Sequence, residues 1–159
     1  MKVHKIKLDA FLEDEPSVFA IHTDAEDYRL AFDLNRNLKI KLTRCKKDLD
    51  FNYIDASFAW FVWEDVKHYT DWSLITNKCL TEVPHKFSSG TLFEEATDKQ
   101  AVLRYLIPEL KNVDYILKIN GLEDENAATH IVKNLQKIST IKTAYIIEKQ
   151  LKSIQNLIT

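Results

Sequence analysis

The amino-acid sequence predicts an α+β fold: a mostly antiparallel sheet with two or three helices packed on one of its faces. Two segments repeat apolar residues at helical spacing, and each lies between apolar runs of strand character. The pattern therefore predicts two β-α-β units that flank an aromatic β-hairpin. With 159 residues and 45% hydrophobic content, residues 1–159 fit a single domain with its own core.

The first β-α-β unit is expected in the N-terminal part of the chain. Residues 3–8 alternate as in a half-buried strand, and the apolar run 17–22 is typical of a buried one. A helix is predicted over residues 24–38, where Asp24 can accept hydrogen bonds from the free amides of the first turn. A strand over residues 39–44 completes the unit. The buried stripe of the helix is expected to contain Leu30, Ala31, Leu34 and Leu38, widened by Tyr28 and Phe32.

The middle of the chain is expected to hold the hairpin and a long loop. Residues 56–65, ASFAWFVWED, carry apolar side chains on both strand faces, which indicates a central strand or a face that a partner covers. Residues 69–79 are the expected antiparallel neighbour of this strand. Residues 81–100 contain Pro84 and Gly90 and are predicted to form a surface loop that can be mobile.

The second β-α-β unit is expected in the C-terminal part of the chain. In residues 105–119, YLIPELKNVDYILKI, Pro108 cannot donate to a sheet ladder, so the chain is expected to leave its strand there. A new strand then begins near Tyr115, whose hydroxyl can anchor the corner while its ring is buried. A helix over residues 120–138 and a strand over residues 140–147 follow.

Composition excludes several classes of function. Rossmann and Walker-type phosphate loops need closely spaced glycines, whereas Gly90 and Gly121 are the only two in the chain. The net charge of −2 gives no global attraction to nucleic acid or to anionic membranes. Cys45 and Cys79 are far apart and are expected to be free thiols, and no apolar run predicts a signal peptide or a membrane span. We therefore expect a cytoplasmic protein.

The side chains that could carry chemistry show no catalytic pattern. The five histidines have no metal-ligand spacing, so we expect neither a metal nor a cofactor. The aromatic run could stack on RNA bases, but Glu64 and Asp65 follow it directly, and packing in the core is favoured. The indoles are nevertheless candidates for an interaction surface, namely Trp60, Trp63 and Trp72.

One motif carries a family resemblance. The residues Ile107-Pro108-Glu109, three further residues and Val113-Asp114-Tyr115 spell I-P-E-x-x-x-V-D-Y. The chain thereby resembles the bacterial IPExxxVDY family, and other stretches over most of its length are similar too. That family has no assigned activity, so the resemblance implies no catalytic residues. A structural corner is one interpretation, and an exposed polar site made by Arg104, Glu109 and Asp114 is the other.

Three functions are expected from these observations. The first is a non-enzymatic interaction or accessory domain with a protein partner or a second copy of itself. The second is an RNA- or ribosome-associated protein, and the third is an enzyme that uses Glu109 or Asp114 as acid or base. The RNA hypothesis requires one basic edge lined by Lys2, Lys5, Lys7, Lys39, Lys41, Arg44, Lys46 and Lys47.

Overall fold

A computed structural model describes residues 15–51, 55–84 and 99–147 of the chain. These residues form a mixed α+β fold with two α-helices and a mostly antiparallel sheet, so these two parts of the prediction, the α+β class and the antiparallel sheet, are confirmed. The strand predicted over residues 3–8 lies outside the described residues.

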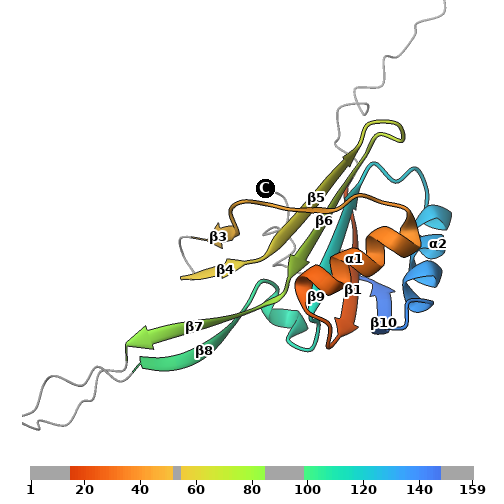
Figure 1. The fold of residues 1–159 in the computed structure, drawn as a ribbon. Coiled ribbons are helices and arrows are strands. Elements are labelled where there is room, and N and C mark those ends of the chain that lie inside the picture. Colours follow the sequence, from red (N-terminus) through yellow and green to blue (C-terminus); the bar gives the residue numbers. More distant parts are fainter. Residues whose placement is uncertain (1–14, 52–54, 85–98, 148–159) are drawn as a thin grey trace, which may run out of the picture.

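Six strands form the central sheet (Figure 1): β1 (Ser17–Thr23), β2 (Thr43–Arg44), β5 (Trp60–Asp65), β6 (Thr70–Thr76), β9 (Tyr115–Asn120) and β10 (Ile141–Ile146). Their order is β10-β1-β9-β6-β5-β2, and each neighbouring pair is antiparallel. β9 lies near the middle of the sheet, and its first five residues are all buried. Both faces of the sheet are therefore covered at this strand, even at Lys118, its one charged residue.

Two helices connect strands across one face of the sheet. α1 (Asp27–Leu38) follows β1 and leads to β2, and α2 (Glu125–Gln136) leads from β9 to β10. Because direction alternates between neighbours, β1 runs parallel to β2, and β9 runs parallel to β10. Other strands of the sheet separate the two strands of each unit, so each helix carries the chain over at least one intervening strand.

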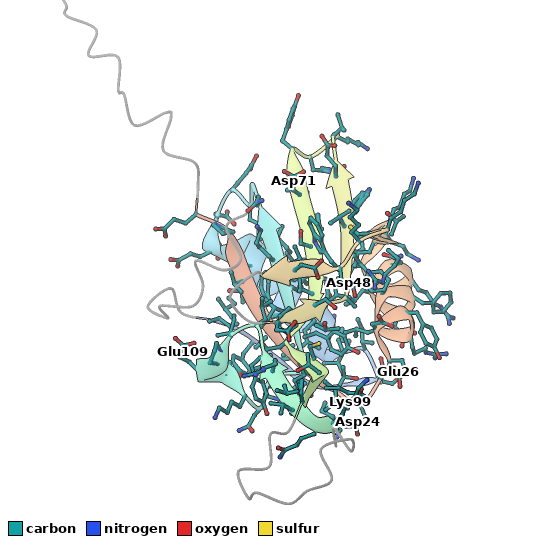
Figure 2. The ribbon with its side chains drawn as sticks, turned by 90° about the vertical axis from the view of Figure 1, so that its left-hand side faces the viewer. Asp24, Glu26, Asp48, Asp71, Lys99 and Glu109 are labelled. Atoms are coloured by element: carbon teal, nitrogen blue, oxygen red, sulfur yellow. The ribbon has the colours of Figure 1, made fainter. Side chains whose placement is uncertain are left out.

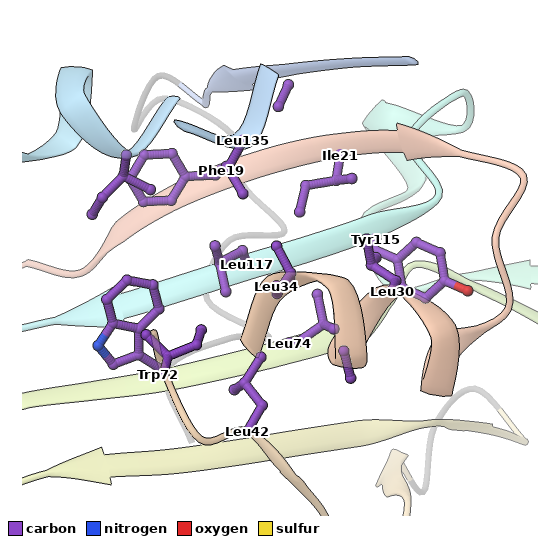
Figure 3. Packing of buried hydrophobic residues seen from close by; sticks show 14 of the residues in the cluster. Phe19, Ile21, Leu30, Leu34, Leu42, Trp72, Leu74, Tyr115, Leu117 and Leu135 are labelled. Carbon is purple, nitrogen blue, oxygen red and sulfur yellow. The ribbon is translucent and has the colours of Figure 1, made fainter. Parts of the chain in front are cut away.

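The main core lies between these helices and the sheet (Figure 3). Leu30 and Leu34 of α1 and Leu135 of α2 are fully buried against the sheet face that carries Phe19 and Leu117. Because successive side chains of a strand point to opposite faces, every second side chain of β1 and β9 lies on the helical face. Burying a large apolar side chain contributes roughly 1.5–3 kcal/mol, so this layer is a main source of stability.

A second, smaller core lies on the opposite face of the sheet. Val18, Ala20 and Ile116 point to this side and pack with Phe58 and Ile107, which come from outside the central sheet. Phe58 lies on β4 (Ala56–Phe58), which pairs with β3 (Leu49–Phe51) in a separate two-stranded sheet. This second core therefore joins the I-P-E-x-x-x-V-D-Y motif to the body of the protein.

A two-stranded arm projects from the body (Figure 1). It consists of β7 (Lys78–Pro84) and β8 (Lys99–Tyr105), paired antiparallel over their full lengths. The surface loop predicted over residues 81–100 is therefore wrong at both ends, where residues 81–84 and 99–100 are strand. Residues 85–98 lie outside the described residues. The prediction failed because Pro84 indicated a loop, whereas proline is tolerated at the end of an outer strand.

Two expectations for α1 are corrected. The N-cap residue is Glu26, with no capping bond from its side chain, and Asp24 instead pairs with Lys142 on β10. Tyr28 and Phe32 do not widen the buried stripe, since they are 69% and 55% exposed. They lie on the helix face that points away from the sheet. The helix therefore presents two aromatic rings to solvent.

Candidate functional site

The motif forms the connection between the arm and the central sheet. β8 ends at Tyr105, a 3₁₀ turn (η2, Pro108–Leu110) follows, and β9 begins at Tyr115. Ile107 and Val113 are buried in the second core, whereas Pro108 is exposed at the outside of the turn. The strand thus ends at Tyr105, slightly before the predicted break at Pro108, and the proline begins a tight helical turn.

Asn77 holds this turn from the inside, and the sequence analysis missed it. This residue lies between β6 and β7 and is fully buried. Its Nδ2 donates to the carbonyl oxygens of Leu110 (2.8 Å) and Val113 (2.9 Å), and its Oδ1 accepts from the amide of Ile107 (2.8 Å). Its backbone carbonyl accepts from the amide of Leu106, also at 2.9 Å. One amide side chain therefore satisfies three backbone groups of the motif.

Asp114 joins three parts of the chain. Its Oδ2 accepts from the backbone amide of Thr23 at 3.0 Å, and its Oδ1 accepts from Nζ of Lys78 at 2.8 Å. Its own backbone amide donates to the carbonyl of Ile21, and its carbonyl accepts from the amide of Asn77. The end of β1 and the start of the arm are thus both bonded to this one residue. Both carboxylate oxygens of Asp114 are committed to the fold.

Tyr115 anchors the start of α1. Its ring packs in the main core, and its hydroxyl donates to the carbonyl of Ala25 at 2.8 Å. Figure 3 shows this hydroxyl pointing toward the connection between β1 and α1. Burial, together with the nearby carboxylates of Asp27, Glu26 and Asp114, raises the pKa of Tyr115 above its ordinary value. The prediction that Tyr115 anchors the corner is confirmed.

Together, Asn77, Asp114 and Tyr115 form what we call the motif corner. Arg104 does not share a polar site with Asp114. Arg104 pairs with Cys79 across the arm, so it faces the opposite side of β7 from Lys78, the residue that bonds Asp114. Glu109 is exposed and lies at the margin of the molecule (Figure 2).

The three indoles predicted as an interaction surface do not share one. Trp72 is only 8% exposed and belongs to the main core. Trp63 is half-buried beside it, with ring centroids 6.1 Å apart, and Trp60 packs against the second core on the other face of the sheet. The expectation of an exposed surface therefore fails for Trp72, and the alternation of β5 separates the other two.

Other reactive side chains in the described part of the chain are also dispersed. No group of three or more His, Cys, Asp or Glu residues there could hold a metal ion. His22 contacts Tyr145, and His68 bonds Asp65 in the turn after β5. Burial raises the pKa of the Cys45 thiol, and the positive charge of Arg44 offsets only part of this increase.

None of the described helices has the length and apolar character to cross a bilayer.

Comparison with known proteins gives no further assignment. No family model, no curated protein and no solved structure matches this chain. The resemblance to the IPExxxVDY family stays a prediction. The functional argument therefore depends on the surfaces that the structure itself presents.

Proposed function

We propose that this protein is a non-enzymatic interaction domain that pairs with a second copy of itself through the β7–β8 arm. The observation that carries the proposal is an exposed leucine pair. Leu80 and Leu103 lie opposite one another in the arm and are 69% and 44% exposed. A two-stranded hairpin is marginally stable by itself in water, so burying one of its faces would stabilise it.

The exposed face of the arm is complementary to itself. Lys78 and Glu82 stand two residues on either side of Leu80, and opposite them on β8 lie Tyr105 and Ala101. A two-fold axis running across the strands at Leu80 would set Leu80 against its own copy. The same axis would set Lys78 against Glu82 of the second copy, and the large Tyr105 ring against the small Ala101. The two copies would therefore be complementary in charge and in side-chain size across the axis.

Existing contacts leave room for this pairing. Lys78 already bonds Asp114, but an ammonium group has three donors and can serve a second carboxylate. Glu82 pairs with Lys99 at 3.3 Å, and both side chains are about two-thirds exposed (66% and 68%). Such an exposed ion pair contributes little to stability and can rearrange at an interface.

Sedimentation velocity of the full chain tests the proposal. Wild-type protein is expected to sediment as a dimer, and Leu80→Glu as a monomer, because the variant would bury two unpaired carboxylates at the axis. Val66→Glu is the matched control, since Val66 is 70% exposed and lies in the β5–β6 turn away from the arm. It should remain dimeric.

A cysteine trap locates the axis. In a variant with Cys45 and Cys79 replaced by Ser and Ala, Leu80→Cys is expected to form a disulfide with its own copy under mild oxidation. Val66→Cys should stay unlinked under the same conditions. A wild-type protein that is monomeric at every soluble concentration would contradict the proposal, as would a dimer that Leu80→Glu leaves intact.

The enzymatic alternative has less support. A general base must reach a proton on a substrate, whereas both carboxylate oxygens of Asp114 already accept hydrogen bonds within the fold. Glu109 lies at an exposed turn, and Arg104 faces the opposite side of the arm from the lysine that bonds Asp114. We therefore assign the motif a structural role and the exposed surfaces the functional one.

A further inference from the structure

A second surface, distinct from the arm, combines exposed rings with positive charge. It covers the outward side of α1 and the segment that follows, and we call it the α1 basic surface. Its members are Tyr28, Phe32, Arg36, Lys39, Lys41, Arg44, Lys46 and Lys47. All eight side chains are exposed. None of them belongs to the motif corner or to the arm.

The positive charge is concentrated in one segment. Residues 34–47 contain six Lys and Arg residues and no Asp or Glu, although the whole chain has a net charge of −2. Asp33 and Asp48 stand at the two ends of this segment, where they pair with Arg29 and Arg44. The local excess of cations therefore exceeds what the composition of the protein predicts, and it favours a polyanionic ligand.

The fold holds this segment against the helix. Asn35 donates from Nδ2 to the carbonyl of Leu42 (3.0 Å) and accepts from the amide of Leu42 (2.7 Å). Ile40 and Leu42 are buried in the main core, so the alternating Lys39 and Lys41 point outward beside α1. The cations are thus positioned by the structure before any ligand binds, which lowers the entropy cost of binding.

The two aromatic rings lie on the same outward side of the helix. Tyr28, Phe32 and Arg36 are spaced four residues apart, so they follow one another along a single face of α1. The Arg29 guanidinium lies 5.9 Å from the centroid of the Phe32 ring and also pairs with Asp33. This contact restrains the Phe32 ring while leaving it 55% exposed.

We propose that the α1 basic surface binds single-stranded nucleic acid. The cations would contact successive phosphates, and unpaired bases would stack on Tyr28 and Phe32. Phosphate contacts alone would suit a double-stranded nucleic acid equally well. In a duplex, however, the faces of the paired bases are stacked on one another, so protein side chains cannot reach them. The exposed rings therefore favour a single strand over a duplex, and a base-bearing ligand over an acidic protein.

Fluorescence anisotropy with a labelled oligouridylate tests the contribution of charge. The test variant replaces Lys39, Lys41, Lys46 and Lys47 with alanine. Each phosphate contact contributes ~0.7 to the slope of log K against log salt for single strands, so four lost contacts should reduce the slope by about 3. The matched control replaces four exposed lysines outside the surface, namely Lys67, Lys111, Lys133 and Lys137. It has the same net charge and should retain the wild-type slope.

A second pair of variants tests stacking. Tyr28→Ala is expected to weaken binding about 5- to 150-fold, the range for loss of one base–aromatic contact. Tyr69→Ala is the control, since Tyr69 is 87% exposed in the β5–β6 turn. It should bind as wild type does.

Three results would overturn the proposal. The first is equal weakening by the two lysine quadruple variants, which would mean non-specific attraction. The second is binding of a duplex, or of polyglutamate, as tight as that of the oligouridylate. The third is a Tyr28→Ala variant with wild-type affinity for the oligouridylate. Since the surface contains no residue of the arm, these outcomes are independent of the dimer.

Discussion

The motif corner and the α1 basic surface are both rich in polar groups but use them in opposite ways. In the corner, the side chains of Asn77, Asp114 and Tyr115 bond backbone groups of the same chain. On the α1 basic surface, the lysines and the rings are exposed to solvent, while Asn35 and Arg44 also donate to backbone carbonyls of the fold and hold the segment in place. Polar groups satisfied within the fold stabilise it, whereas exposed ones are available to a ligand.

The motif is easy to recognise in the sequence but has a structural role, whereas the α1 basic surface is the one we propose for binding. The motif stands out in the sequence, yet the Asp114 carboxylate within it joins β9 to β1 and to the arm. The segment after α1 has no such signature, although it carries a run of exposed cations and follows a helix with two exposed rings. We therefore expect substitutions in the corner to reduce stability, and substitutions on the α1 basic surface to reduce binding.

The largest loss of stability is expected for Asn77→Ala. The substitution leaves the buried amide of Ile107, the buried carbonyl of Val113 and the partly buried carbonyl of Leu110 without their partner. At about 1–3 kcal/mol for each of the two buried groups, the free energy of unfolding should fall by roughly 2–6 kcal/mol. Urea unfolding measures the loss. Asn112→Ala, an exposed position of the same loop, is the control and should change the free energy by less than about 0.5 kcal/mol.

A smaller loss of stability is expected for Asp114→Ala, and it should exceed the loss for Lys78→Ala, the partner in its ion pair. Asp114→Ala removes the acceptor of the Thr23 amide and should cost about 2 kcal/mol. Lys78→Ala removes only the ion pair, whose two side chains are 33% and 28% exposed, and should cost less than about 1 kcal/mol. Equal losses in the two variants, measured by urea unfolding, would show that the ion pair matters more than the bond to β1.

Tyr115→Phe is expected to reduce stability by about 1 kcal/mol at neutral pH, because it removes the hydroxyl that bonds Ala25 and keeps the ring. The pKa of Tyr115 is raised in the folded state, so its contribution is full below the unfolded pKa of about 10 and is lost above it. The phenylalanine variant has no hydroxyl at this position, so its stability does not fall through ionisation of residue 115. The stability difference between wild type and variant should therefore shrink as pH rises above about 10 in urea unfolding, and a constant difference would contradict this account.

The smallest change in stability is expected on the outward side of α1. Phe32→Ala should alter the free energy of unfolding by no more than about 0.5 kcal/mol, since its ring is 55% exposed. Leu34→Ala, two positions further along the same helix but fully buried, should cost about 2–5 kcal/mol. A large loss for Phe32→Ala in thermal or urea unfolding would place the ring in the core, as the sequence pattern alone predicts.

Periodicity made much of the fold predictable. The apolar run of residues 17–22, expected to form a buried strand, and the buried stripe of Leu30, Ala31 and Leu34 depend on local patterns, and the structure confirms both. Pro108 was a reliable signal for the same reason, because its missing amide acts at its own position. The anchor at Tyr115 was predictable from the need of a buried hydroxyl for a partner.

The remaining features depend on contacts that the sequence order does not reveal. Asn77 lies 30 residues before Ile107, and in a stretch that already contains several polar residues nothing local marks it. The exposure of Tyr28 and Phe32 depends on how wide a stripe of α1 the sheet can cover, which the helical spacing leaves open. The burial of Trp72 follows from its place on β6 in the interior of the sheet.

Native-state hydrogen exchange tests the central claim most directly, namely that the motif corner serves the fold. The amides of Thr23, Asn77, Leu106 and Ile107 all donate to groups of Asp114 or Asn77. If the corner is part of the cooperative core, these four amides should exchange only through opening with nearly the global free energy of unfolding. Exchange as fast as that of the exposed Lys111 and Asn112 amides would contradict the account, because the corner would then open without unfolding the protein.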